Sequence, residues 1–359
     1  MVRKEFLQLF RDPRMYGILL AGPAMQLVVF GFAVSTDVRD TATFLVDQDR
    51  TAASRELAEA WTASGYFRIV GRSQDPGELV RALDHGDAIV GLTIPVGFAA
   101  DLGRSEGTVQ VLLDGSNSNL ATVARGYAEQ ILTTWGLTAT EIRVEPPVEL
   151  RHRAFFNPDL ASRDYNVPAV IGAIITLICL LLTSLSIVRE REIGTLEQLM
   201  VSPIRPIELL VGKTIPFGLI GILDMALVTA LAVLFFKIPL VGSVGLLFLA
   251  TVLYLLSALG AGLLISTISK TQQEAFMSTF LVLMPTLLLS GFMFPVRSMP
   301  KFFQWVAYLN PLTHYLEIIR GIFLKGVGME ALWFQHAALL VLGAVLMATA
   351  VARFQKHVA

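Results

Sequence analysis

Long stretches without a single charged residue constrain this chain more than any other feature. No Asp, Glu, Lys or Arg occurs in residues 15–36, 166–188 or 238–269. A helix of about 20 predominantly apolar residues is long enough to cross the hydrocarbon core of a bilayer, which is about 30 Å thick. Only 16% of all residues are charged, whereas a soluble domain carries about a quarter. The sequence therefore predicts an integral membrane protein.

Six transmembrane helices are expected. The apolar stretches predict spans at residues 15–36, 167–188, about 214–236, within 238–269, 275–296 and 331–352. A cleaved secretory signal is the competing interpretation of the first stretch, since Ala33 and Ser35 could form a small-residue cleavage site. Its apolar core is too long for a signal peptide, and other spans follow, so an uncleaved span is preferred.

The predicted fold class is an α-helical integral membrane protein with an extracytoplasmic α/β domain inserted between spans one and two. That domain covers residues 37–165, and the remaining spans form a transmembrane domain over residues 166–352. Residues 353–359 are expected to be a cytoplasmic tail. The single cysteine, Cys179, excludes a disulfide within the chain.

The insert differs from the rest of the chain in charge and in pattern. Between residues 36 and 165 there are 12 Lys and Arg against 19 Asp and Glu. Strand-like runs at 43–46, 67–70, 88–94 and 109–113 alternate with helical patterns. This alternation favours βα units and a largely parallel sheet. Asp75 followed by Pro76 predicts the start of one of the helices, and Gly86 predicts its end.

The short charged flanks of the spans predict the orientation, because Lys and Arg collect on the cytoplasmic side of a membrane. With the N-terminus inside, the inner flanks hold eleven Lys or Arg residues and the short outer flanks hold five. Both termini are therefore expected in the cytoplasm. The long insert then lies on the outer side.

A charged island at residues 189–206 separates spans two and three. Ile193, Leu196 and Met200 follow helical spacings of three and four, which predicts a short helix with one apolar stripe. Pro203 interrupts that helix and turns the chain back towards the membrane. A surface helix held between two spans can be displaced by a partner in the cytosol.

The first 14 residues also form an amphipathic pattern. Phe6, Leu9 and Phe10 share one helical face, and basic residues fall elsewhere. The pattern predicts a helix over residues 1–14 that lies in the membrane interface. A plain basic flank is the alternative.

No catalytic motif is present in the sequence. Gly212-Lys213-Thr214 resembles the end of a phosphate-binding loop, but that loop needs a glycine at position 207, which is isoleucine. His314 and Glu317 share a helical face, but two ligands without a third are more often a surface pair than a metal site. We therefore expect no enzyme activity, no metal and no cofactor in this chain, and no nucleic-acid partner.

Two features of the spans suggest a transport path. Asp224 lies near the middle of span three, where a charged group is costly and usually faces a helix-bundle interior or a wet cavity. A hydrogen-bonded, protonated carboxyl is the alternative. The segment 297–330 is apolar in part but carries Glu317 and Arg320, so it is expected to form an outer re-entrant segment. With Phe292 and Phe294 these residues are candidates for an outer gate, or for an interfacial anchor without gating.

Several further segments resemble one known family. They are VDQDRTAASREL (46–57), VQVLLDGSNSN (109–119), FFNPDLASRDYNVP (155–168), SIVREREIGTLEQLMVSPIRPIELLVGK (186–213), GLLISTISKTQQEA (262–275), LLLSGFMFPVRSMP (287–300) and YLNPLTHYLEIIRGIFLKGVG (308–328). In order and spacing the chain resembles ABC-2 type transporter permeases, and more narrowly bacterial multidrug-export permeases with a large extracytoplasmic domain. The resemblance covers essentially the whole length. One departure is Asp224, because relatives tend to carry an uncharged residue there.

The resemblance implies partners and a location. Such permeases are inner-membrane proteins that dimerise with a second copy or a sister permease, and a separate ATP-binding cassette subunit binds ATP and Mg. Amphipathic substrates such as drugs would then leave the cytoplasm or inner membrane. A periplasmic adaptor and an outer-membrane channel are expected as well, with lipids around the spans. The loop after span two is similar to a coupling helix, which implies ATPase contacts at Glu190, Arg191, Glu192, Gly194, Thr195, Leu196 and Glu197. Residues 1–14 resemble the connecting helix beside it.

Two other functions stay open. A permease for a lipid or polymer carrier would share the same architecture. A membrane-anchored sensor with an outer ligand-binding domain is an alternative from another class, although a sensor needs only one or two spans.

Overall fold

The computed structural model describes residues 17, 21–33, 40–104, 106–116, 118–139, 156, 162–194 and 206–358. The chain divides into two compact units. One is an α/β unit at Thr36–His152, and the other is a helical unit formed by Met1–Ser35 together with Arg153–Ala359. Each unit is described by itself.

The α/β unit is built on a four-stranded sheet in the order β2-β1-β3-β4. Its strands are β1 (Thr41–Asp47), β2 (Phe67–Ser73), β3 (Val90–Ile94) and β4 (Gln110–Leu113). The first three are parallel, and β4 is antiparallel to β3. Each strand overlaps one of the four predicted runs, so the prediction of a largely parallel sheet is confirmed.

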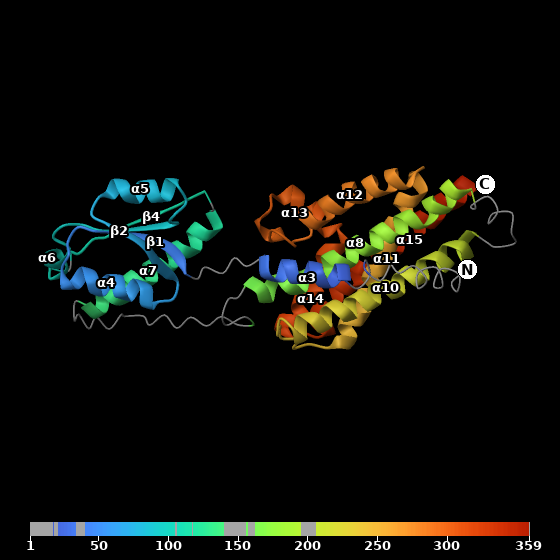
Figure 1. The fold of residues 1–359 in the computed structure, drawn as a ribbon. Coiled ribbons are helices and arrows are strands. Elements are labelled where there is room, and N and C mark those ends of the chain that lie inside the picture. Colours follow the sequence, from blue (N-terminus) through green and yellow to red (C-terminus); the bar gives the residue numbers. More distant parts are fainter. Residues whose placement is uncertain are drawn as a thin grey trace. The chain divides into compact units, whose positions relative to one another are not determined.

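Helices cover both faces of that sheet. They are α4 (Ala52–Ala63), α5 (Pro76–Asp84), α6 (Phe98–Leu102) and α7 (Ser118–Ala139). Figure 1 shows α5 on one face and α4 with α7 on the other. Asp75 accepts a hydrogen bond from the Gly77 backbone N–H at 2.8 Å and so caps α5, as predicted. Gly86 has a φ of 76°, which suits the left-handed turn after the helix.

An aromatic pair fills the core of the α/β unit. Trp61 is fully buried and stacks on Phe67 with 4.3 Å between ring centroids. The Trp61 indole N–H donates to the Thr43 hydroxyl at 3.3 Å, so its polar atom is satisfied inside the core. Leu45 of β1, alternate residues of β3 (Val90, Leu92 and Ile94) and apolar residues of α4, α6 and α7 complete this core.

The helical unit consists mainly of long apolar helices. Its described elements are α3 (Gly22–Ala33), α8 (Ser162–Ile193), α10 (Pro206–Leu234), α11 (Val244–Ile268), α12 (Gln272–Leu289), η2 (Val296–Ser298), α13 (Lys301–Tyr308), α14 (Pro311–Arg320), the π-helical turn η3 (Gly321–Lys325) and α15 (Met329–Val358). Four stretches within the described residues are long and apolar enough to cross a membrane: Ser162–Ile193, Glu208–Leu234, Val244–Ile268 and Met329–Phe354. They correspond to the predicted spans two, three, four and six.

Predicted span one lies partly outside the described residues, and its described part contains α3, which has 12 residues. Predicted span five corresponds to α12. Helix α12 has 18 residues and ends at Leu289, seven residues before the predicted end at Val296. The chain leaves the helix there because Gly291 adopts a φ of 83° and Pro295 follows. The helix therefore ends before the last residue of the predicted span, next to the segment 290–300 whose glycine and prolines predict its end.

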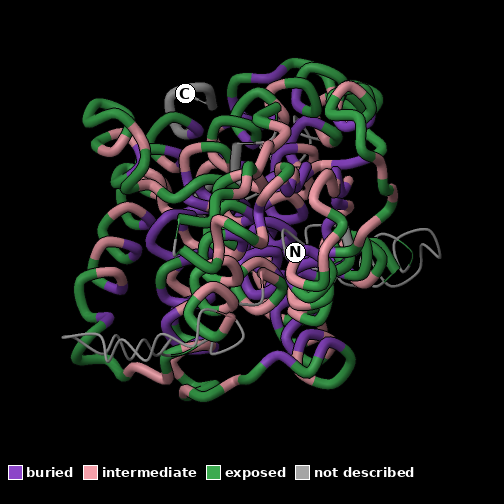
Figure 2. The backbone as a smooth tube through the Cα atoms, turned by 90° about the vertical axis from the view of Figure 1, so that its left-hand side faces the viewer, coloured by how far each residue is buried: buried purple, intermediate pink, exposed green. Residues whose placement is uncertain are grey.

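Close helix packing holds the long helices together. Helix α8 contacts α3, α10, α11, α12 and α14, and the most extensive contact in the unit joins α11 to α15. A methyl group added at Gly260 would lie 2.9 Å from the Met347 backbone nitrogen, so α11 and α15 approach each other closely at this glycine. Figure 2 shows buried positions along the inward faces of the helices and exposed positions along their outward faces.

Candidate functional site

A buried ion pair lies where α8 meets the start of α10. Lys213 and Glu190 are 3.3 Å apart (Nζ to Oε1), and their side chains are only 2% and 12% exposed. The Lys213 ammonium also donates to the Ser186 carbonyl oxygen at 3.2 Å. Because Ser186 and Glu190 are four residues apart on one face of α8, a single lysine can reach both. The pair fixes the beginning of the charged island to the third span.

The next two charged residues bind the connection between α11 and α12. The Arg191 guanidinium donates to the Ser269 carbonyl oxygen at 2.7 Å, which satisfies an acceptor just beyond the C-terminus of α11. The Glu192 carboxylate accepts from the Gln272 backbone N–H at 2.7 Å and from the Gln272 side-chain amide. The end of α8, the start of α10 and the α11–α12 connection are therefore joined. We call these contacts the island network.

The island network engages three of the residues that were predicted to contact a partner ATPase. Glu190, Arg191 and Glu192 use their side chains within the chain. Gly194 has a φ of 78°, and among the described residues no atom lies within 4 Å of an added Cβ. Ile193 beside it is 63% exposed. The other expected contact residues, Thr195, Leu196 and Glu197, lie outside the described residues, as do Phe6, Leu9 and Phe10 of the expected connecting helix.

Sequence reasoning missed the three residues that receive these contacts, Lys213, Ser269 and Gln272. Lys213 was assessed only as part of a failed phosphate-binding loop. A signal for it did exist, because a lysine two turns inside an apolar helix needs a carboxylate partner, and Glu190 lies at the end of the preceding span. Nothing in the sequence pointed to the backbone atoms of residues 269 and 272.

Asp224 lies in the middle of α10 and is 2% exposed. Its Oδ2 atom has no hydrogen-bond partner among the described residues. One turn earlier, Gly221 lets α10 approach Leu255 of α11 and Cys179 of α8. Asp224 is therefore buried within the helical unit, and both its role in a substrate path and the hydrogen-bonded alternative stay predictions.

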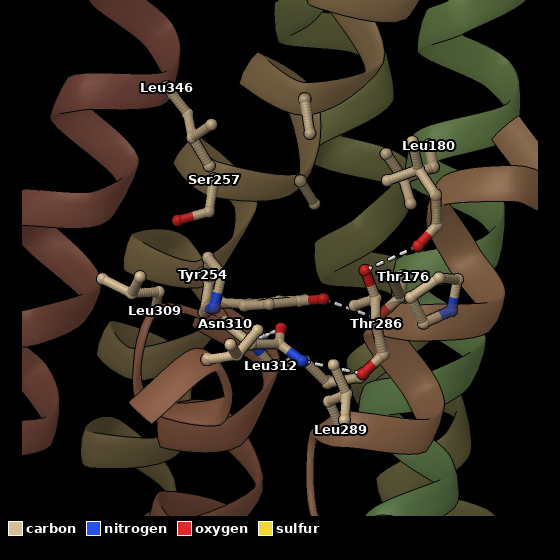
Figure 3. Close-up of a pocket in the computed structure, with 16 residues that line it drawn as sticks. Thr176, Leu180, Tyr254, Ser257, Thr286, Leu289, Leu309, Asn310, Leu312 and Leu346 are labelled. Carbon is tan, nitrogen blue, oxygen red and sulfur yellow. Dashed lines mark hydrogen bonds between the residues drawn. The ribbon is translucent and has the colours of Figure 1, made fainter. Parts of the chain in front are cut away.

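A cavity of about 330 Å³ lies among α8, α11, α12, α13, α14 and α15. Its polar lining residues are Thr176, Tyr254, Ser257, Thr286 and Asn310, and all others are apolar. In Figure 3 the Tyr254 side chain reaches across towards Thr176, to which it is hydrogen-bonded. The amide of Asn310 donates to the Thr286 carbonyl oxygen at 2.7 Å and so joins the start of α14 to α12. Asp224 does not line this cavity.

The four candidate gate residues occupy different environments. The Arg320 guanidinium lies 3.8 Å from the centre of the Tyr165 ring and donates to the Gly291 carbonyl oxygen at 3.0 Å. It thus joins α14 to α8 and to the turn after α12. Phe292 packs edge-on against Phe30 of α3, with 6.0 Å between ring centroids.

The other two gate candidates make different contacts. Phe294 is 58% exposed, and Glu317 accepts a hydrogen bond from Gln335 of α15 at 3.1 Å. The ring of His314 contacts the Tyr308 carbonyl oxygen rather than Glu317. Within the part of the chain that the structure describes, no group of three or more His, Cys, Asp or Glu residues could hold a metal ion.

Comparison with known proteins identifies relatives over the full length. Residues 15–353 match the family described as ABC-2 family transporter protein. The chain is 34% identical over 360 residues to the probable multidrug ABC transporter permease YbhR of Escherichia coli K12, covering all of this chain and 98% of the relative. It is also 34% identical over 332 residues to the probable multidrug ABC transporter permease YbhS of the same strain, covering 90% of this chain and 87% of the relative. The inner membrane transport permease YhhJ of that strain is 29% identical over 355 residues, or 95% of this chain and 94% of the relative.

Proposed function

The chain belongs to the ABC-2 family of transporter proteins, and from that premise we propose that it is the membrane-spanning permease subunit of an ATP-binding cassette exporter. A separate subunit binds ATP and Mg and hydrolyses the nucleotide. The exported molecules are drugs or other amphipathic compounds, a proposal supported by the printed names of the relatives YbhR and YbhS. Export by this chain therefore depends on movement transmitted from a partner.

The island network is the observation that carries this proposal. A displacement applied to the loop after α8 passes directly to α10 through Lys213 and to the α11–α12 connection through Ser269 and Gln272. Charge-assisted hydrogen bonds are roughly twice as strong as neutral ones, so the three segments move together rather than separately. The open surface at Ile193 and Gly194 is where the ATPase contacts the chain, continuing into Thr195, Leu196 and Glu197.

The proposed topology has six spans, with α3 and α12 inside spans one and five and with both termini in the cytoplasm. The α/β unit then lies outside, in the periplasm of a Gram-negative cell. Cysteine at Gln74, which is exposed in that unit, should react with an impermeant maleimide in intact spheroplasts. Cysteine at exposed Lys270 should react only after permeabilisation. The native Cys179 is buried and gives little background, and the opposite labelling pattern would overturn the orientation.

Further partners follow from the proposal. A second permease copy or a sister permease completes the membrane pathway, and the acidic α/β unit meets a periplasmic adaptor leading to an outer-membrane channel. Asp224 is proposed to take part in the substrate path or in proton coupling, because its Oδ2 is buried without a described partner. Asp224→Asn should then flatten the pH dependence of export in vesicles while the protein still inserts. An unchanged pH profile would remove this role.

Site-specific photocrosslinking tests the partner. A photoreactive amino acid at Ile193, which is exposed and helical, should capture a chain that carries ATP-binding cassette motifs, identified by mass spectrometry. The same group at Gln74 serves as the control and should not capture that chain. No adduct at position 193, or equal adducts at both positions, would contradict the proposed function.

A further inference from the structure

The cavity of Figure 3 has an uncharged lining. Apart from its five polar residues, every residue that lines it is apolar, and no Asp, Glu, Lys, Arg or His is among those described there. Moving an ion into such surroundings without a partner is costly, whereas a neutral hydrocarbon body is favoured. A volume of about 330 Å³ lies at the lower end of the range for small-molecule pockets, about 300–1,000 Å³. The lining therefore selects against charged ligands.

Most of the polar groups in the lining are already engaged. The Thr286 hydroxyl donates to the Val282 carbonyl oxygen at 2.8 Å. The side chain of Asn310 donates to the Thr286 carbonyl oxygen and accepts from the Leu312 N–H at 3.0 Å. The Thr176 hydroxyl donates to the Gly172 carbonyl oxygen, so it accepts the hydrogen bond that it shares with Tyr254. These groups hold the walls in place and leave little capacity for a ligand.

Two groups on one face of α11 keep hydrogen-bonding capacity. The Ser257 hydroxyl is buried and has no partner among the described residues. Tyr254 uses its proton towards Thr176, which leaves the lone pairs of its oxygen as acceptors. The two hydroxyls point in different directions, because that of Tyr254 reaches Thr176 of α8 whereas that of Ser257 lies against α15 near Gly343. The Tyr254 oxygen is therefore the acceptor that a ligand head can bond.

We propose that this cavity binds a neutral amphiphile that has one hydrogen-bonding head, such as a hydroxyl, and a hydrocarbon body. The head lies against the Tyr254 oxygen, and the body lies against the apolar residues of α12 and α14. The site is complete within one chain and does not require the proposed function. Only the fate of the bound molecule, which is either exported or kept as a resident membrane lipid, rests on the proposed export function.

Photolabelling of the purified full-length permease tests the site directly. The probe is an octanol that carries a diazirine, and labelled residues are mapped by mass spectrometry. Labels should concentrate on the lining residues of α8, α11 and α12. Excess decanol should reduce this labelling about tenfold, which corresponds to about 1.4 kcal/mol, whereas decyltrimethylammonium and decanoate at equal concentration should leave it unchanged.

A matched pair of variants on α12 provides the control. Val282 lines the cavity and is 40% exposed, whereas its neighbour Leu281 is 75% exposed and does not line it. Val282→Trp should reduce cavity labelling about tenfold by closing the mouth, and Leu281→Trp should leave it as in the wild type. Ala261→Phe fills the interior from α11 and should have the same effect as Val282→Trp. Even labelling of all lipid-facing residues, or equal protection by the cationic competitor, would overturn the proposal.

A second measurement separates the two sources of ligand. If the amphiphile is an export substrate, decanol should stimulate ATP hydrolysis by the assembled exporter with wild-type permease and not with Val282→Trp. If it is a resident lipid, labelling persists without stimulation. Both results support the site, and only loss of specific cavity labelling contradicts it, so failure of this inference is distinguishable from failure of the proposed function.

Discussion

The two ends of the helical unit are held together by different chemistry. At the end of α8 the contacts are ionic or charge-assisted, through Glu190, Arg191 and Glu192. Around the cavity the contacts are made by neutral groups, such as Asn310 and the Tyr254–Tyr315 stack, and the charged Arg320 bonds the nearby turn after α12. The charged end is suited to receiving a displacement from a partner without loosening. The neutral end is suited to accommodating an apolar molecule. The following experiments test this contrast.

The largest effect is expected at the charged end. Lys213→Leu leaves the buried Glu190 carboxylate without its ammonium, and breaking a buried pair in this way costs about 3–5 kcal/mol. The free energy of unfolding in mixed micelles should fall accordingly. Adding Glu190→Gln to Lys213→Leu should restore a large part of that loss, because no charge is then left buried. A double variant as unstable as the single one would contradict the role of the pair.

At the contact between α11 and α15, the unfolding free energy should depend on close packing rather than on charge. Gly260→Ala forces a methyl group against the backbone of α15, where an added Cβ lies 2.9 Å from Met347 N, and should cost about 1–3 kcal/mol. Gly245→Ala on the same helix meets only the Ser243 hydroxyl oxygen at 3.5 Å. This control should be neutral or slightly stabilising, because alanine has the higher helix propensity. Equal unfolding curves for the two variants would argue against close packing of α11 on α15.

At the cavity we expect a smaller loss of unfolding free energy, together with weaker ligand binding. Asn310 caps α14 through the Leu312 N–H and joins it to Thr286. Asn310→Ala should cost about 1–2 kcal/mol in unfolding free energy, and it should weaken photolabelling of the cavity. Asn310→Ser keeps a capping oxygen but loses the bond to α12, so it should retain most of the stability and still weaken labelling. If Asn310→Ser labels as well as the wild type, the bond to Thr286 does not shape the cavity.

Local sequence signals predicted the α/β unit well. The four strands and the start of α5 follow from alternating patterns and from the chemistry of Asp75 and Pro76, which act over a few residues. The long apolar helices follow from composition for the same reason. The end of α12 is signalled in the sequence by Gly291 and Pro295, but its exact position depends on the left-handed turn at Gly291.

The candidate sites were harder to predict, because they depend on contacts between distant segments. Lys213 and Glu190 are 23 residues apart, and the Arg191 bond reaches a backbone oxygen 78 residues away. The cavity takes residues from six helices, and none of these residues is distinctive in the sequence. Asp224 was noticed because a charge in a span is rare, but its lack of a described partner required coordinates.

The central claim is that a partner ATPase acts through the loop that begins at the end of α8. The direct test is ATP hydrolysis by the reconstituted complex, with and without substrate, for Glu192→Lys and Gly194→Trp. Glu192→Lys removes the acceptor for Gln272, and Gly194→Trp places a bulky residue at an open, left-handed position. Gly194→Asn tolerates that backbone and is the control. The account predicts basal hydrolysis without substrate stimulation in both variants and normal stimulation in the control. Normal stimulation and export in both variants would show that the island does not couple the two subunits.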